Sequence, residues 1–399
     1  MSRKKIAIIH HVAALGGGTK SLLDLVDMLK DNFDLTVILP QAGEGFRKKL
    51  HENNVELIEL SYSIPIYSAY SGRPPILSGD MVRAWLSLIN INKICKQIER
   101  LGVDVLVLNS IVLSIIAPFI DKKIRIICID RETIVTNTSK KIYRLILDNN
   151  IYAVGFIANI EKEKLALKKC KTFLIPDSVS IQKLVDTEYS QACIENHLPI
   201  EKYKILFMGG SSRIKGLNLI LEAANRLDNN YLFVIAGTFN KNLFTKKNII
   251  KHWYSKSYRE YFYSVRKELR KNRNVKENSE NNVLFVGNRT SVDSLICACD
   301  VIVFPSTYVH QPRPCIEAGY YHKPVILSDY KETEEYFINK YNALTFKPND
   351  VSDLVSKIQY AKENKELMRT IGEKNYLMST EKHNYEQIKR NLNTIILDN

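Results

Sequence analysis

The stretch Lys204-Ile205-Leu206-Phe207-Met208-Gly209-Gly210-Ser211-Ser212-Arg213-Ile214-Lys215-Gly216 decides the fold, because it joins a short apolar run to a glycine-rich loop. The residues that follow it carry apolar side chains at the spacing of one helical face. A strand, a glycine loop and an amphipathic helix in this order are typical of the start of a doubly wound α/β domain. The apolar helical positions are Leu219, Ile220, Ala223 and Leu227.

The N-terminal half begins in the same way, with an apolar run over 5–9, then Gly16-Gly17-Gly18, then a helical apolar face over 22–29. Near-continuous apolar runs alternate with helical patterns in both halves, which is typical of parallel sheets covered on both faces. Such sheets bind ligands at the carboxyl ends of their strands. The sequence therefore predicts an α/β fold of two tandem Rossmann-like, doubly wound domains with an inter-domain cleft. The expected strands are 5–9, 35–39, 55–58, 103–108 and 124–129, followed by 204–208, 231–235, 283–286, 301–304 and 324–327.

A polar stretch over about 178–202 separates the two series of strands. The length of 399 residues also favours two domains over one, because a single hydrophobic core rarely organises so long a chain. We expect an N-terminal domain over 1–180 and a C-terminal domain over 181–375. The segment 376–399 is expected to be a helix that returns to the first domain.

The composition is that of an ordinary globular protein, with 45% hydrophobic and 25% charged residues. No apolar run approaches the roughly 20 residues that a membrane-spanning helix needs. The basic start at Met1–Lys5 precedes only four apolar residues, which indicates a strand and not a signal peptide. Seven cysteines lack the spacing of zinc or redox motifs, so buried reduced thiols are expected. These features predict a cytoplasmic protein.

The net charge of +14 implies an anionic partner, and more than half of it lies in a basic insertion over 240–282. This insertion holds twelve Lys or Arg against four Glu, with aromatic residues such as Trp253 and Tyr254 between them. Such a segment suits the interface of an anionic membrane. It equally suits an exposed helix with a solvated basic face. We do not expect nucleic-acid binding, because no recognition module is visible.

The two glycine loops are candidates for binding a nucleoside diphosphate, because backbone N–H groups at a helix N-terminus reach phosphate only where no side chain intervenes. The loop Gly16-Gly17-Gly18 fits neither a P-loop, since Thr19 precedes Lys20, nor the dinucleotide fingerprint, whose third glycine falls on Ser21. It could equally serve only to pack a strand against a helix. The second loop places Arg213 and Lys215 before a helix, where fixed cations would neutralise a departing diphosphate.

A third candidate follows the expected strand 301–304, where Phe304-Pro305-Ser306 leads to the run from His310 to Gly319. Pro314 suits the first position of a helix, so Glu317 is expected in the opening turn, next to the cleft. A carboxylate there can accept hydrogen bonds from both hydroxyls of a ribose. A glutamate in the first turn of a helix also interacts favourably with the helix dipole. Glu317 could therefore either bind a ribose or stabilise the helix.

In order and spacing, these motifs resemble the retaining GT-B glycosyltransferases of family 4, the group 1 glycosyltransferases. The resemblance covers the C-terminal domain almost completely. The N-terminal domain is similar more loosely, through its glycine loop, Asn109-Ser110 and Arg131-Glu132. The C-terminal motifs are Gly209–Gly216, Phe285-Val286-Gly287, Asp300–Ser306, Ile316-Glu317-Ala318, Lys323–Ile326 and Asn342-Ala343-Leu344.

The resemblance implies transfer of a sugar from a nucleoside-diphosphate sugar to a hydroxyl of a glycan or lipid-linked acceptor, as in cell-surface polysaccharide biosynthesis at the inner face of the cell membrane. The N-terminal domain would then lie on the acceptor side, and the C-terminal domain would bind the donor. No metal and no cofactor besides the donor is expected, since the leaving phosphate helps to deprotonate the acceptor. The implied catalytic residues are Lys215, Arg213, His310 and Arg131, and the implied donor-binding residues are Gly17, Gly18, Gly210, Lys215, Arg313, Ile316 and Glu317.

Three positions depart from the family pattern. The first of the two family glutamates falls on Val309, so His310 or Gln311 is expected to contact the sugar instead. The family arginine falls on Gly210, so we expect either that Arg213 replaces it or that the loop is remodelled. Arg131 stands where the family has a histidine. Two other functions fit the fold: a nucleotide-sugar epimerase and a non-catalytic protein that binds sugar nucleotides.

Overall fold

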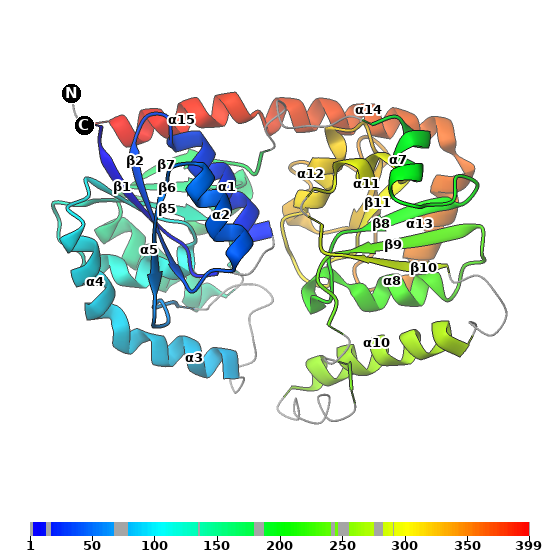
Figure 1. The fold of residues 1–399 in the computed structure, drawn as a ribbon, viewed down its shortest axis with the longest axis horizontal. Coiled ribbons are helices and arrows are strands. Elements are labelled where there is room, and N and C mark those ends of the chain that lie inside the picture. Colours follow the sequence, from blue (N-terminus) through cyan, green and yellow to red (C-terminus); the bar gives the residue numbers. More distant parts are fainter. Residues whose placement is uncertain are drawn as a thin grey trace. The chain divides into compact units, whose positions relative to one another are not determined.

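The computed structural model describes residues 3–12, 17–67, 79–134, 136–178, 187–240, 244–245, 255–274, 282–289 and 291–398, with residues 17, 79–80 and 272–274 described by their backbone alone. The chain forms two compact units. Unit 1 comprises 1–180 together with 385–399, and unit 2 comprises 181–384. Figure 1 shows a sheet flanked by helices in each unit. Gly16, Trp253, Tyr254 and most of the remaining insertion outside 255–274 lie outside the described residues.

Unit 1 is built on a parallel sheet of seven strands in the order β3-β2-β1-β4-β5-β6-β7. The order reverses between β1 and β4, which are neighbours through pairs such as Ile8 with Val107. The carboxyl ends of two such strands form the topological switch point, where doubly wound folds bind ligands. The strands are β1 (Lys5–Ile9), β2 (Asp34–Pro40), β3 (Glu56–Leu60), β4 (Val105–Leu108), β5 (Arg125–Asp130), β6 (Ala153–Phe156) and β7 (Lys171–Leu174).

The helices of unit 1 bury apolar side chains against both faces of this sheet. One core contains Ile9, Leu108 and Phe156, and the other contains Ile8, Val26 and Leu392. Leu392 belongs to the C-terminal helix α15 (Tyr385–Leu397), which packs within unit 1. The other helices are α1 (Gly17–Leu29), α2 (Glu44–Glu52), α3 (Gly79–Ser87), η1 (Leu88–Asn90), α4 (Ile91–Arg100), η2 (Ile111–Phe119), α5 (Asn137–Asn150) and α6 (Asn159–Leu165).

Unit 2 repeats this plan with a parallel sheet of six strands in the order β10-β9-β8-β11-β12-β13. Its order reverses between β8 and β11, which pair at Ile205 with Val301. The switch point of unit 2 therefore lies at the ends of β8 and β11. The strands are β8 (Tyr203–Phe207), β9 (Tyr231–Ala236), β10 (Val283–Gly287), β11 (Val301–Phe304), β12 (Val325–Ser328) and β13 (Leu344–Phe346).

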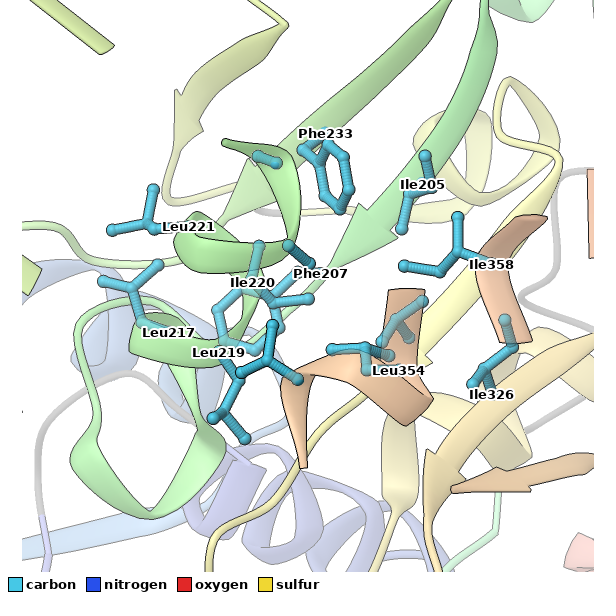
Figure 2. Close-up of a cluster of buried hydrophobic side chains, with 14 of the residues drawn as sticks. Ile205, Phe207, Leu217, Leu219, Ile220, Leu221, Phe233, Ile326, Leu354 and Ile358 are labelled. Atoms are coloured by element: carbon cyan, nitrogen blue, oxygen red, sulfur yellow. The ribbon is translucent and has the colours of Figure 1, made fainter. Parts of the chain in front are cut away.

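A buried apolar cluster joins this sheet to its helices, and Figure 2 shows Phe207 and Phe233 from the strands beside Ile220 and Leu354 from the helices. Each of these four side chains is at most 1% exposed. The helices of unit 2 are α7 (Tyr189–Glu195), η4 (Arg213–Lys215), α8 (Leu217–Ala224), α10 (Lys256–Asn274), α11 (Asp293–Cys297), α12 (Arg313–Gly319), η7 (Lys331–Thr333), α13 (Val351–Glu363) and α14 (Lys365–Lys382).

The α/β fold with two doubly wound sheets is confirmed. The ten strands expected from apolar runs are present. Three more strands were missed: β6 (Ala153–Phe156), β7 (Lys171–Leu174) and β13 (Leu344–Phe346), which contain only three or four residues each. All seven cysteines are free thiols. Within the described ranges, no helix is long and apolar enough to cross a membrane.

Candidate functional site

The loop after β8 turns tightly into α8 because two of its positions require glycine. Gly216 has a φ of +80°, and a Cβ atom there would overlap the carbonyl oxygen of Pro305. Gly210 has a φ of +55°, and a Cβ atom would lie 2.7 Å from the backbone oxygen of Thr238. The amide of Gly210 donates to the carbonyl of Ala236 at 3.0 Å, so the protein already supplies its acceptor. Both glycines thus fix the loop against neighbouring strand ends.

Lys215 and His310 come together at the switch point of unit 2, from the loops after β8 and β11. Lys215 Nζ lies 2.7 Å from His310 Nε2. An ammonium group only donates, so this imidazole nitrogen must accept and carry no proton. The Lys215 ammonium also lies 4.9 Å from the ring centroid of Phe304. His310 therefore holds the Lys215 side chain at the carboxyl end of the sheet.

The guanidinium of Arg213 lies between two tyrosine rings. It is 4.7 Å from the ring centroid of Tyr258, on α10, and 4.7 Å from that of Tyr308. Its Nη1 also donates to the Tyr308 hydroxyl at 2.9 Å. The same helix α10 contacts the loop a second time, because the Tyr261 hydroxyl donates to the carbonyl of Ser211 at 2.8 Å. The basic insertion thus braces the glycine loop, a role that the sequence did not reveal.

The rings of α10 point mainly into unit 2. Tyr261 and Phe262 are 5% and 6% exposed and belong to the core, whereas Tyr263 is 65% exposed. Among the described residues of the insertion, Tyr263 is the one large aromatic side chain that is mostly exposed. Among the side chains of α10 that the structure describes, the other exposed ones are polar, and four of them are cations: Lys256, Lys267, Arg270 and Lys271.

Arg313 and Glu317 form a buried ion pair on α12, with Nε to Oε1 at 2.9 Å and side chains 9% and 10% exposed. The helix begins at Arg313 and not at Pro314, so Glu317 lies just beyond the first turn, one residue deeper than expected. Because Glu317 is the fifth helical residue, its position is better explained by the ion pair with Arg313 than by helix capping. Ile316 is 2% exposed, and its side chain packs in the interior.

In unit 1, Arg131 follows β5 and takes part in a polar chain. Its Nη1 donates to Asp177 Oδ1 at 2.9 Å, and its Nε donates to Asn109 Oδ1 at 2.8 Å. The Asn109 amide nitrogen lies 3.2 Å from His10 Nδ1. Asp177 also accepts from Ser21 of α1 at 3.0 Å. Asp177 follows β7 in a polar stretch, where no sequence signal singled it out.

Burial shifts the titration of several groups around Arg131. Desolvation, with the neighbouring His11 and Arg131 charges, lowers the pKa of His10 to about 3, and desolvation lowers the pKa of His11 to about 4. Burial also raises the pKa of Glu132 to about 7 and that of Asp130 well above its usual range. Both histidines are therefore neutral at physiological pH, and the two carboxyl groups carry less negative charge than they would in water.

Gly17 and Gly18 form the first residues of α1. An ideal Cβ atom on Gly18 would lie 3.6 Å from Cε1 and Nε2 of His10, so the start of α1 faces that imidazole. No group of three or more His, Cys, Asp or Glu side chains that could hold a metal ion occurs in the part of the chain that the structure describes.

Residues 194–378 match the sequence model of the family described as Glycosyl transferases group 1. This similarity covers a little less than half of the chain, and residues 194–378 are called the group 1 domain below. The resemblance to the group 1 glycosyltransferases inferred from the motifs is thereby confirmed for these residues. The group 1 domain contains Lys215, His310, Arg313 and Glu317, and it includes the braced loop and α10. A comparison with curated protein sequences finds no match.

Solved structures extend the similarity beyond the group 1 domain to the whole chain. Anabaena Alr3699/HepE, in complex with UDP and glucose, has a TM-score of 0.77 at 15% identity, with 100% of both chains covered. Sucrose-phosphate synthase from Thermosynechococcus elongatus has a TM-score of 0.74 at 16% identity, with 98% of each chain covered. TarM of S. aureus has a TM-score of 0.68 at 15% identity, with 98% of this chain and 99% of that chain covered. At these identities the likeness shows the fold, and it confirms the GT-B architecture.

Proposed function

We propose that the protein is a retaining glycosyltransferase that moves a sugar from a nucleoside-diphosphate sugar to a hydroxyl of a glycan or lipid-linked acceptor. The observation that carries this proposal is the Lys215–His310 contact at the switch point of the group 1 domain. A fixed ammonium group at that place can neutralise the charge that develops on a departing diphosphate. We propose that transfer is metal-independent, with Lys215 supplying from the chain itself the positive charge that a metal ion would otherwise provide.

Glu317 and Arg213 of unit 2 suit the ribose and the phosphates of a nucleotide-sugar donor. Glu317 would accept hydrogen bonds from ribose hydroxyls, with Arg313 holding its carboxylate in place. Arg213 would supply a second positive charge to the phosphates, at the position where its two tyrosines hold it. HepE was solved with UDP and glucose and TarM with UDP, so UDP is the first nucleotide to test on this chain.

In the proposed reaction, the bond between the anomeric carbon and the diphosphate oxygen breaks, and the acceptor oxygen bonds to that carbon on the same face. The acceptor's proton passes to the leaving phosphate. The part of Lys215 is to stabilise the phosphate as its charge grows, and no protein nucleophile is needed. The configuration at the anomeric carbon is therefore retained.

The proposal is tested by incubating the purified protein with UDP-, GDP- and ADP-sugars in EDTA and measuring release of the nucleoside diphosphate. We expect release with one of them, and a product whose NMR spectrum shows the donor's anomeric configuration. An inverted product would overturn the retaining mechanism. Release abolished by EDTA and restored by Mg²⁺ would overturn the metal-independent one. Tight binding without release or sugar modification would indicate a non-catalytic protein, and conversion of the sugar to its epimer would indicate an epimerase.

We further propose that the acceptor belongs to cell-surface polysaccharide biosynthesis and that the protein binds the cytoplasmic face of an anionic membrane. The exposed cations Lys256, Lys267, Arg270 and Lys271 of α10 support this contact electrostatically. Co-sedimentation with vesicles of anionic lipid should therefore exceed that with neutral vesicles, and equal sedimentation would contradict the electrostatic contact.

A further inference from the structure

Unit 1 carries a patch of exposed apolar side chains on α3 and η1, which follow one another without an intervening residue and lead directly into α4 (Figure 1). No other ten-residue stretch of the described ranges holds more than two exposed large apolar or aromatic side chains. Single exposed apolar residues are normal on a protein surface, but such a cluster indicates an interaction site. The members of this apolar patch are Val82, Trp85, Leu86, Leu88 and Ile89, which are 43%, 55%, 66%, 38% and 84% exposed.

The opposite face of the same segment fixes it to unit 1. Met81, Ala84 and Ser87 recur every three residues, and all three are buried. The Ser87 hydroxyl oxygen accepts a hydrogen bond from the Ile66 amide at 3.3 Å and donates one to the Ala84 carbonyl at 2.6 Å. An amphipathic helix usually turns its largest apolar side chains toward the core. Here the alanine and the serine face inward, while the tryptophan and the leucines face solvent.

The charged residues of this segment all have the same sign. From Met81 to Ile98 the chain contains three cations and neither Asp nor Glu. The cations are Arg83, Lys93 and Lys96, and all three side chains are exposed. A surface that joins apolar side chains to cations alone repels a second copy of itself and attracts an anionic partner. The charge therefore favours an anionic surface over self-association.

The residue types of the segment suit a lipid bilayer better than an acidic protein. Helices that lie in the plane of a membrane interface present Trp and Leu to the acyl chains and Lys or Arg to the headgroups. A tryptophan ring favours this depth because its body is apolar while its indole N–H group stays within reach of water. A protein partner would need a pocket shaped to each protruding side chain. Fluid acyl chains need no such complementarity.

We propose that the apolar patch of α3 and η1 is a membrane-binding surface that inserts Trp85, Leu86 and Ile89 into the acyl boundary of an anionic bilayer. Lys93 and Lys96 then lie at the level of the anionic headgroups. The patch adds an inserted, apolar contact on unit 1 to the electrostatic contact proposed for α10. It requires neither that electrostatic contact nor the transfer reaction.

The first experiment observes the insertion of Trp85 directly. The chain has 2 tryptophans, so Trp253→Phe leaves Trp85 as the only one in the full-length protein. With vesicles of phosphatidylglycerol and phosphatidylcholine, we expect its emission to move to shorter wavelength and brominated acyl chains to quench it. Vesicles of phosphatidylcholine alone should give a much weaker response. Emission that anionic vesicles leave unchanged would overturn the proposal.

Substitutions at exposed positions separate insertion from electrostatic attraction. For Leu86→Gln we expect the partition coefficient onto anionic vesicles to fall about 5- to 30-fold, because an apolar side chain no longer leaves water. The matched control is Leu145→Gln on α5, since Leu145 is also a leucine of unit 1 that is 66% exposed, and it should bind like wild type. Lys93→Gln and Lys96→Gln should each lower partitioning onto anionic vesicles about 5-fold. Equal losses for Leu86→Gln and Leu145→Gln would contradict the role of the patch.

Two other occupants of the patch give different results, and either result would overturn the proposal. If a second copy covers it, the wild type sediments as a dimer without lipid, Leu86→Gln sediments as a monomer, and Trp85 does not respond to vesicles. If an acidic protein covers it, the wild type neither dimerises nor inserts Trp85. Failure of the α10 contact looks different, because replacing Lys267, Arg270 and Lys271 by Gln then leaves vesicle binding unchanged while the Trp85 shift persists.

Discussion

The ammonium group of Lys215 lies 2.7 Å from Nε2 of His310, and the two side chains come from the loops that follow the two neighbouring strands β8 and β11. A lysine that donates to an imidazole nitrogen loses rotamer freedom before any ligand arrives. Such preorganised charge is what the stabilisation of a leaving diphosphate requires. This contact is the structural centre of the proposed chemistry.

Removing that charge should slow transfer. For Lys215→Ala we expect kcat/KM to fall roughly 30- to 1000-fold, because about 2 to 4 kcal/mol of transition-state stabilisation is lost. The control is Lys365→Ala, which removes an exposed lysine at the start of α14 and should leave kcat/KM unchanged. Steady-state kinetics of donor turnover provide the measurement. A Lys215→Ala enzyme with wild-type kcat/KM would remove this lysine from the mechanism.

The Arg313–Glu317 pair should matter for stability as well as for ribose binding. Arg313→Ala removes the charged partner of a nearly buried carboxylate, so we expect the free energy of unfolding to fall by about 3 kcal/mol. The exposed pair Arg369–Glu366, with side chains 76% and 85% exposed, offers a control of the same chemistry. Arg369→Ala should change stability by less than about 0.5 kcal/mol. Urea denaturation of both variants gives the comparison, and equal losses would contradict the role assigned to burial.

The contact between Tyr258 of α10 and Arg213 should affect the affinity for the donor. Tyr258→Leu removes one of the two rings beside Arg213, so we expect KM for the donor to rise about 3- to 10-fold with little change in kcat. Tyr258→Phe keeps a ring and should preserve most of the affinity. Tyr263→Leu, at an exposed position of the same helix, should have no effect. If Tyr258→Leu and Tyr263→Leu behave alike, the insertion does not position Arg213.

The buried histidine gives a pH dependence with a defined sign. Because the pKa of His10 falls from 6.5 to about 3 on folding, the unfolded chain binds more protons between these values, and stability decreases as pH falls below 6.5. Between pH 7 and pH 5 this group alone should cost about 2 kcal/mol. His10→Phe should therefore gain about that much stability relative to wild type over the same interval. Urea denaturation at the two pH values measures the difference, and a constant difference would contradict the shift.

Glu132 should give the stability a pH dependence of the opposite sign to that of His10. Its pKa rises from 4.5 to about 7 on folding, so the folded protein holds a proton that the unfolded chain has lost between these values. The stabilisation is present below pH 4.5 and is lost as pH rises through 7. Relative to wild type, Glu132→Gln should therefore become less stable on acidification from pH 7 to pH 5. If Glu132→Gln instead gained stability relative to wild type on acidification, as is expected for His10→Phe, the result would be inconsistent with the burial of this carboxyl group.

The fold could be predicted from the sequence because each strand and helix leaves a local pattern. The loop Gly209–Gly216 and the segment around Glu317 could be found for the same reason, since their residues are adjacent in the chain. The chain of hydrogen bonds from Asp177 through Arg131 and Asn109 to His10 could not. Its members follow four different strands, and only the sheet order brings them together.

The contacts of α10 escaped prediction for a different reason. Tyr258 lies 45 residues after Arg213 in the chain, within a segment whose alternating cations and rings suit either an exposed or a packed helix. Periodicity indicates a helix there, but tertiary packing decides which rings turn inward. Tyr261 is buried and Tyr263 is exposed, although both have the same side chain.

The most direct test of the central claim is a thermal-shift and calorimetric titration of wild type and Lys215→Ala with UDP, GDP, ADP and CMP, each with and without EDTA. A ligand that binds only the folded protein raises its melting temperature. One nucleoside diphosphate should stabilise the wild type to the same extent with and without EDTA, and Lys215→Ala should bind it more weakly. No shift with any nucleotide, or a shift that EDTA abolishes, would contradict it.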